Sequence, residues 1–258
     1  MLRPRIIPCL LVQKGGLVKT VGFKAPKYVG DPINAVKIFN EKEADELVVL
    51  DIDATANGVE PDYRMIANLA AECRMPLCYG GGIKIPEQAK RIIGLGVEKV
   101  AISSAAVENP ALITHIADEI GRQSVVVVLD VKKRILSKEY DVFIQNARNN
   151  TKQSVLDLAV QAEKFGAGEL VINSIDLDGQ MKGYDLALAQ KIRQAVNIPI
   201  TILGGAGSLS DIGALIRSCG VVGASAGSLF VFKGVYKAVL INYPTSSQRD
   251  ELIRGALG

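Results

Sequence analysis

Two glycine-rich segments of this chain have the composition of phosphate-binding loops. Residues 80–82 are all glycine, residues 204–207 read Gly-Gly-Ala-Gly, and each segment follows an apolar run. Glycine lets the backbone approach a ligand closely and direct its N–H groups at an anion. Further along the chain, each of the two glycine-rich segments is followed by a segment of small residues. We therefore predict two phosphate sites, although the glycines alone would also suit tight turns. The predicted ligands are Gly81, Gly82, Ser103, Ser104, Gly204, Gly205, Gly207, Ala226, Gly227 and Ser228.

Three aspartates at the ends of apolar runs are candidates for acid–base or hydroxyl-binding roles. Asp130 ends a run in which residues 125–129 are all Val or Leu. A lone carboxylate in such a place can transfer a proton, so we predict that Asp130 is catalytic; the alternative is a structural aspartate. Asp51 and Asp178, the latter followed by Gly179, are predicted to bind substrate hydroxyls or to support neighbouring groups.

These features occur twice along the chain. The glycine runs, the acidic strand ends near Asp51 and Asp176, and the small-residue segments each recur 122 to 125 residues later. Repetition at about half the chain length indicates a barrel built from two duplicated halves.

Eight short apolar runs without strict alternation predict strands that are buried on both faces of a parallel sheet. They lie at 5–12, 47–52, 75–79, 98–103, 124–130, 168–174, 198–203 and 220–225. Helical apolar spacing occurs between and after them, at 32–43, 61–74, 86–94, 109–120, 154–165, 185–196, 210–219 and 234–240. Eight β–α units with right-handed crossovers predict a (β/α)8 TIM barrel over residues 1–258 as one domain. An open, doubly wound sheet is the alternative.

Two long connections are expected on the active face of such a barrel, where the loops after the strands form the site. The basic, glycine-containing residues 13–30 predict a mobile lid. Lys19 on this lid is a candidate phosphate ligand, with an ordinary solvated lysine as the alternative. Residues 132–152 predict an excursion with a small hairpin through 140–143. A short polar tail is expected after Pro244.

Composition argues against several classes of function. The formal net charge is +3, with no basic block, which argues against nucleic-acid binding. No apolar run reaches the roughly 18–20 residues of a membrane helix, and we expect a cytoplasmic protein without a secretory signal. The four cysteines predict reduced thiols. His115 is the only histidine, so neither a metal site nor Ser-His-Asp chemistry is expected, and no cofactor is predicted.

Segments spread almost from end to end resemble HisF, the cyclase subunit of imidazole glycerol phosphate synthase. They are residues 5–10, 30–32, 45–47, 79–83, 105–110, 166–169, 174–179 and 204–207. The resemblance implies a barrel that works with a HisH-like glutaminase bound at its N-terminal face. That glutaminase releases ammonia, which passes through the barrel to a phosphorylated acceptor at the C-terminal face. The ring of charges that gates ammonia in that family falls on Arg5, Glu46, Lys99 and Glu169.

The chain departs from that family around the predicted catalytic centre. The family's two catalytic aspartates map to positions 11 and 130, where this chain has Leu11 and Asp130. Two further family residues, an asparagine and a serine, are replaced here by Ser103 and Leu203. Leucine cannot transfer a proton, and loss of a catalytic acid costs about 10²–10⁴-fold in rate. These changes indicate altered acceptor chemistry.

These departures from the family pattern make the chain resemble the HisF paralogues of surface-polysaccharide clusters, known as WbuZ or glycosyl amidation-associated proteins. The same resemblance is carried by residues 10–12, 24–32, 39–43 and 227–232. That resemblance implies an ammonia-dependent synthase subunit for lipopolysaccharide biosynthesis. Its ammonia would convert an N-acetyl group of a nucleotide-linked sugar into an acetamidino group, with a third, amidotransferase-like protein completing the chemistry. Two other functions stay open: the cyclase of histidine biosynthesis, and a non-catalytic scaffold that channels ammonia.

Overall fold

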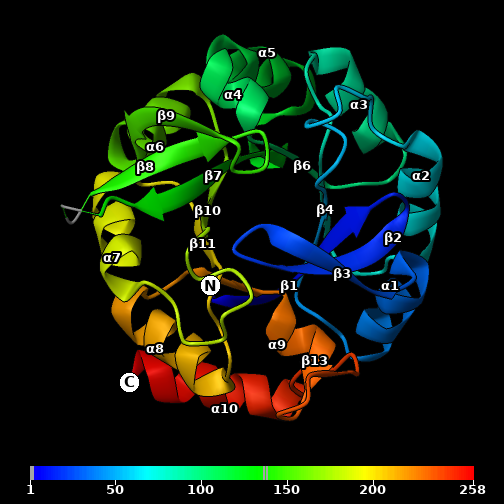
Figure 1. Ribbon diagram of the computed structural model, residues 1–258, viewed down its shortest axis with the longest axis vertical. Coiled ribbons are helices and arrows are strands. Elements are labelled where there is room, and N and C mark those ends of the chain that lie inside the picture. Colours follow the sequence, from blue (N-terminus) through cyan, green and yellow to red (C-terminus); the bar gives the residue numbers. More distant parts are fainter. Residues whose placement is uncertain (1–2, 136, 138) are drawn as a thin grey trace.

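Eight parallel strands close into a barrel in the computed structural model, which describes residues 3–135, 137 and 139–258. Parallel pairing joins each strand to the next, and the pairing of β1 with β12 closes the barrel. Figure 1 shows the strands around a central axis with helices outside them. The chain is therefore a (β/α)8 TIM barrel, as the sequence predicts. Its strands are β1 (Arg5–Gln13), β4 (Leu47–Asp51), β5 (Leu77–Gly80), β6 (Lys99–Ile102), β7 (Val125–Lys133), β10 (Glu169–Ser174), β11 (Ile200–Leu203) and β12 (Gly223–Ala226).

Helices cover the outside of the barrel. A polar side chain caps the start of five of them, because Asp31, Asp62, Asp185, Ser208 and Thr245 each accept a hydrogen bond from a backbone N–H three residues on. Such caps satisfy N–H groups that a helix start leaves unpaired. The outer helices are α1 (Pro32–Glu41), α2 (Tyr63–Glu72), α3 (Pro86–Gly94), α5 (Ala111–Ile120), α6 (Val155–Phe165), α7 (Leu186–Ala195), α8 (Leu209–Cys219) and α10 (Ser246–Leu257). Shorter helical turns are α4 (Ser104–Glu108), α9 (Ser228–Val231) and η1 (Arg122–Ser124).

The predicted helix over 234–240 is wrong. This segment connects β13 (Phe232–Lys233) to β14 (Ala238–Val239), which pair in antiparallel fashion. Gly234 and Lys237 have φ of 72° and 49°, a left-handed backbone that suits a turn and interrupts a helix. The predicted polar tail is also wrong, because α10 follows and buries side chains against the barrel.

The prediction of a loop over 13–30 is wrong as well. β2 (Gly16–Val21) and β3 (Lys24–Gly30) form an antiparallel hairpin that continues β1 through the register Leu11↔Val18. Its polar, exposed strand β3 gave no apolar pattern from which a strand could be predicted. The predicted hairpin through 140–143 is present, with β8 (Tyr140–Ile144) and β9 (Asn149–Ser154) extending β7. Both hairpins lie across the same face of the barrel (Figure 1).

Apolar side chains fill the inside of the barrel and separate its two ends. Inward-pointing residues alternate with outward-pointing ones along each strand. The inner cluster consists of Ile7, Cys9, Val48, Cys78, Ala101, Val126, Val128, Val171 and Leu203. All four cysteines are free thiols, and His115 is exposed on α5. Within the described residues, no helix combines the length and apolar character needed to cross a membrane.

Candidate active-site cavity and charged ring

A cavity of about 1170 Å³, its open mouth included, lies at the carboxyl ends of the barrel strands. This is where (β/α)8 enzymes bind their substrates. Every residue that the sequence predicts for catalysis or substrate binding lines it, except Gly207. The Gly207 N–H instead donates to the Asp211 carboxylate at 2.9 Å, so this glycine belongs to the capped start of α8.

Asp130 lies in the wall of this cavity, on β7. Asn173 is its direct partner in the register of β10, and the Asn173 Nδ2 donates to Asp130 Oδ1 at 2.9 Å. Burial raises the pKa of the Asp130 carboxyl to about 7; hydrogen bonds from Asn173 and Ser103 oppose the rise, and the charge of Asp178 adds to it. At neutral pH this carboxyl is therefore populated in both protonation states, which suits general acid–base catalysis.

The surroundings of Asp130 are largely apolar. Leu11 and Leu203 line the same cavity, together with Cys9, Leu50 and Val128. Position 11 thus faces the cavity, as the resemblance to the family implies, and supplies no second acid. The apolar walls remove water from the Asp130 carboxyl, which is the physical origin of its raised pKa.

The first glycine site follows β5. Gly81 has φ of 125°, and a Cβ there would lie 2.5 Å from the Asp51 carbonyl oxygen, so only glycine fits. The Gly82 N–H donates to Thr55 Oγ1 at 3.0 Å. Ser103 precedes α4, and Ser104 begins it with its Oγ accepting from the Gln145 N–H at 2.9 Å. The predicted residues therefore meet at one place, but part of their hydrogen bonding is directed to protein partners.

The second glycine site follows β11 and β12. A Cβ on Gly205, which has φ of 107°, would collide with the Gly183 carbonyl. Gly204 precedes it, and Ala226, Gly227 and Ser228 lead from β12 into α9.

Lys19 lies beside this second site, on a strand rather than on a loop. It is a buried residue of β2, and its Nζ donates to the Cys9 carbonyl at 2.7 Å and packs against Gly227. Burial lowers the pKa of Lys19, and nearby Cys9 and Asp178 oppose that change. The solvated-lysine alternative is therefore excluded.

The carboxylates of Asp51 and Asp178 both have protein partners. Asp51 accepts from the N–H groups of Asp53 and Ala54 at 3.0 and 3.1 Å, and burial raises its pKa. Asp178 accepts from Thr20 Oγ1 at 2.7 Å and from the Phe23 N–H at 3.0 Å. Asp178, with Gly179 packed under the Thr20 carbonyl, ties the β2–β3 hairpin to the loop after β10. These contacts favour supporting roles.

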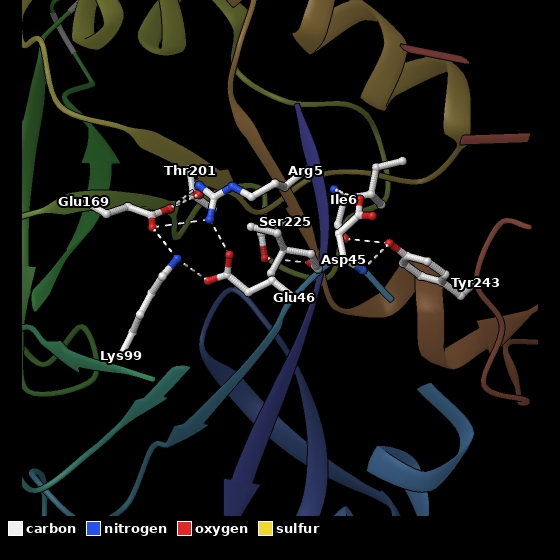
Figure 2. Close-up of polar contacts among 10 residues, drawn as sticks. Arg5, Ile6, Asp45, Glu46, Lys99, Glu169, Thr201, Ser225 and Tyr243 are labelled. Atoms are coloured by element: carbon white, nitrogen blue, oxygen red, sulfur yellow. Dashed lines mark hydrogen bonds and ion pairs between the residues drawn. The ribbon is translucent and has the colours of Figure 1, made fainter. Parts of the chain in front are cut away.

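Arg5, Glu46, Lys99 and Glu169 form a closed charged ring at the opposite end of the barrel (Figure 2). Arg5 pairs with Glu46 and, at 2.7 Å, with Glu169. Lys99 closes the ring with contacts of 2.8 Å to Glu46 and 2.9 Å to Glu169. Each charge therefore touches two opposite charges, and the glutamate side chains are only 5–6% exposed.

The ring strongly stabilises the ionised form of Glu169. Burial by itself raises the pKa of Glu169, but Arg5 and Lys99 lower it to about 2. Thr201, buried on β11, contributes a hydrogen bond of 2.6 Å from its Oγ1 to Glu169. The ring residues begin β1, β6 and β10 or precede β4, which places the ring at the N-terminal face.

A second polar cluster beside the ring fixes the end of the chain (Figure 2). The Tyr243 hydroxyl donates to the Ile6 carbonyl at 2.7 Å and accepts from the Asp45 N–H at 3.1 Å. Asp45 in turn accepts from the Ile6 N–H at 2.9 Å. Arg249 on α10 stacks over the Tyr243 ring, 5.2 Å from its centroid. The last helix is thereby fastened to the start of β1.

Sequence reasoning missed Asn173, Thr201 and Thr20. The first two are single polar residues inside apolar strands, a signal that was available but that also fits ordinary buried hydroxyls and amides. Thr20 lay in the segment interpreted as a loop. Among the described residues, no group of three or more His, Cys, Asp or Glu side chains is arranged to hold a metal ion.

Comparisons with known proteins agree with this geometry. The family model described as "Histidine biosynthesis protein" matches residues 5–237. Two relatives named "Putative imidazole glycerol phosphate synthase subunit" are similar over nearly their whole length: HisF of Leptospira interrogans (59% identical over 252 residues; 98% of this chain, 99% of the relative) and hisF3 of Vibrio vulnificus strain YJ016 (57% over 253 residues; 98% and 97%). The imidazole glycerol phosphate synthase subunit HisF of Lactococcus lactis strain IL1403 is 42% identical over 230 residues, 89% of each chain. The chain therefore belongs to the histidine biosynthesis protein family and is a HisF-like member of it.

Proposed function

We propose that this chain is the ammonia-accepting barrel subunit of a glutamine-dependent amidotransferase. The observation that carries the proposal is the pairing of two features at opposite ends of one apolar interior. A closed charged ring lies at the N-terminal face, and Asp130, with a pKa of about 7, faces the cavity at the C-terminal end.

The N-terminal face is the proposed docking site of a HisH-like glutaminase. Ammonia is small and uncharged, so crossing the apolar side chains of the barrel interior would cost it far less than it costs an ion. The four ring residues close this path by pairing with one another, and movement of Lys99 away from Glu46 and Glu169 would open it. Lys99 is the best candidate because it is a flexible, single-point ammonium rather than a guanidinium fork.

The two glycine sites support an acceptor with two phosphate groups. Short helical turns begin at Ser104 and Ser228, and the first N–H groups of such turns lack intrahelical partners. The Lys19 ammonium lies beside the second glycine site. A nucleotide-linked sugar carries a diphosphate, and a bisphosphate metabolite carries two separate phosphates, so both acceptor classes fit.

Leu11 favours the sugar as acceptor. Acid–base catalysis of ring closure needs two groups on opposite sides of the substrate, and the cavity offers Asp130 with Leu11 in the other position. Conversion of an N-acetyl group to an acetamidino group joins ammonia to the amide carbon and releases the oxygen as water. A third, amidotransferase-like protein would activate that oxygen, which leaves this chain to deliver ammonia and to supply or accept one proton at Asp130.

Two alternatives remain as proposals. The cyclase of histidine biosynthesis is favoured by the name of the relative from Lactococcus lactis, an imidazole glycerol phosphate synthase subunit. A non-catalytic scaffold that passes ammonia onward is favoured by Leu11. Complementation of a strain that lacks the cyclase separates the first alternative from the other two.

Glutamine hydrolysis tests the ammonia-accepting role directly. A HisH-type glutaminase should co-purify with the wild-type chain and hydrolyse glutamine faster in its presence. Lys99→Met should change that stimulation, whereas the exposed Lys90→Met, whose Nζ also lies 2.8 Å from a glutamate, should leave it unchanged. A wild-type chain that neither binds nor stimulates the glutaminase contradicts the proposal.

A further inference from the structure

Asn173 has a buried side chain beside Asp130, the acid proposed to transfer a proton in the cavity. Its side chain lies on β10 directly opposite Asp130 in the strand register, and Asn173 itself is only 6% exposed. The neighbouring strand β11 places the apolar Leu203 opposite Asn173. The amide therefore lies between an acid and an apolar wall, and it donates a hydrogen bond to Asp130 Oδ1.

We infer that Asn173 is a positioning residue that fixes which oxygen of Asp130 carries the acidic proton. In a neutral carboxylic acid the carbonyl oxygen accepts hydrogen bonds well, whereas the hydroxyl oxygen serves mainly as a donor. The 2.9 Å bond from Asn173 Nδ2 therefore makes Oδ1 the carbonyl oxygen of the protonated form. The proton is left on Oδ2. The inference rests on the acid–base role proposed for Asp130.

The same bond also influences when the proton leaves. An N–H donor stabilises a carboxylate more than a neutral acid, because the charged acceptor makes the stronger bond. Asn173 thus opposes the effect of burial and keeps Asp130 close to neutrality. Without it, Ser103 would be the remaining donor, and burial would hold Asp130 protonated above neutral pH, so that its resting form could act as an acid but not as a base.

Spectroscopy on the full chain tests this without any acceptor or partner. The Asp130 carboxyl is followed by its ¹³C resonance from pH 4 to pH 10 and by the infrared C=O stretch of its protonated form, both assigned by their loss in Asp130→Asn. Asn173→Leu keeps the side-chain size and removes the amide. The pKa of Asp130 should rise by about one unit, a tenfold change in the protonation equilibrium, and the C=O band should move to higher frequency as its hydrogen bond is lost.

A matched control comes from Asn146, which lines the same cavity. Asn146 has φ of 57°, so Asn146→Gly removes an amide without straining the backbone, and the titration of Asp130 should stay as in the wild type. Asn173→Asp gives a second readout, because two adjoining carboxyls share a proton and titrate in two coupled steps. An unchanged Asp130 titration in both Asn173 variants overturns the inference, as does a raised pKa with an unshifted C=O band. Failure of the glutaminase assay would instead concern the function proposed above, since these measurements need no ammonia.

Discussion

Glu169 and Asp130 are two acids inside the same barrel, and their pKa values move in opposite directions. Glu169 lies at the N-terminal end between Arg5 and Lys99, and its pKa falls to about 2. Asp130 lies at the C-terminal end beside a neutral amide, and its pKa rises to about 7. Burial acts on both in the same direction, so the partners decide the sign.

The comparison indicates what each end of the barrel can do. A carboxylate with a pKa near 2 stays ionised at any physiological pH and can only hold a fixed charge in place. A carboxyl with a pKa near 7 can give and take a proton. The N-terminal end is therefore suited to electrostatic closure and the C-terminal end to proton transfer.

The largest expected effect concerns the missing partner of Asp130. We predict that the wild-type chain converts the bisphosphate precursor of histidine biosynthesis at least 10²–10⁴-fold more slowly than a cyclase with both aspartates, even with saturating ammonia. Leu11→Asp should recover part of this activity, since Ser103 and Leu203 still differ from the family pattern. Product formation is measured with ammonium salts in place of glutamine, which removes any need for a glutaminase.

A second substitution at position 11 is the control for this measurement. Leu11→Asn has nearly the same shape as Leu11→Asp but adds no acid, so it should not recover activity. Wild-type turnover close to that of ordinary cyclases would contradict the sugar-amidination proposal and support the proposal of a cyclase of histidine biosynthesis.

The opposite pKa shifts predict opposite pH dependences of stability. The pKa of Asp130 is higher in the folded state than the unfolded value of about 3.9, so its contribution to the free energy of unfolding decreases as pH rises from about 4 to about 7. The pKa of Glu169 is lower than its unfolded value of about 4.3, so its contribution decreases as pH falls from about 4 towards 2. The change should amount to roughly 4 kcal/mol for Asp130 and roughly 3 kcal/mol for Glu169.

Urea denaturation between pH 2 and pH 9 measures both effects. The difference between wild type and Asp130→Asn should change only above pH 4, and that between wild type and Glu169→Gln only below about pH 4.5. Parallel profiles for the two variants would mean that the charged ring does not protect Glu169 from protonation as its geometry indicates.

Two lysine–glutamate ion pairs with the same N–O distance allow the charged ring to be compared with the protein surface. Lys99 lies 2.8 Å from buried Glu46, and Lys90 lies 2.8 Å from exposed Glu119. Lys99→Met should lower the free energy of unfolding by about 2 kcal/mol, below the full cost of an unpaired buried charge because Arg5 still contacts both glutamates. Lys90→Met should cost less than about 1 kcal/mol. Equal costs in chemical denaturation would show that the ring is no more than a set of surface ion pairs.

The barrel could be predicted from the sequence because its strands are apolar runs and the motifs at their ends repeat at about half the chain length. The segments that were misjudged lack such a pattern. β3 is polar and exposed because it faces solvent as the outer strand of a hairpin, and residues 234–240 combine a glycine with β-branched residues that suit a helix poorly. The few apolar residues of α10 predict a polar tail, although Thr245 and Gln248 form a capping box at the start of this helix.

The positions of the site residues could be predicted, but their partners could not. Strand ends in a parallel barrel meet at one face whatever the side chains, so Asp130 and the glycine runs fall together. Which groups bond to them depends on side-chain packing between strands far apart in the chain. Asn173 reaches Asp130 across 43 positions and Thr20 reaches Asp178 across 158, and neither distance leaves a periodic signal in the sequence.

The smallest expected effect concerns the attachment of the β2–β3 hairpin, which holds Lys19 beside the second glycine site. The charged ring fastens the N-terminal end with four ion pairs, whereas the Asp178 carboxylate holds this hairpin through Thr20 Oγ1 and the Phe23 N–H. Thr20→Val keeps the side-chain shape and removes the hydroxyl donor, so the free energy of unfolding should fall by about 1 kcal/mol. Amide hydrogen exchange should accelerate in residues 16–30 and stay unchanged in the outer helices, because local opening of the hairpin leaves the barrel closed.

Thr151→Val is the matched control for this prediction, because Thr151 also donates a 2.7 Å hydrogen bond, but to a backbone carbonyl of the other hairpin. This variant should accelerate exchange in residues 140–154 instead. Faster exchange throughout the barrel in Thr20→Val would show that the hairpin is part of the global folding unit, and the contrast between a tightly fastened N-terminal end and a separately opening C-terminal hairpin would then fail.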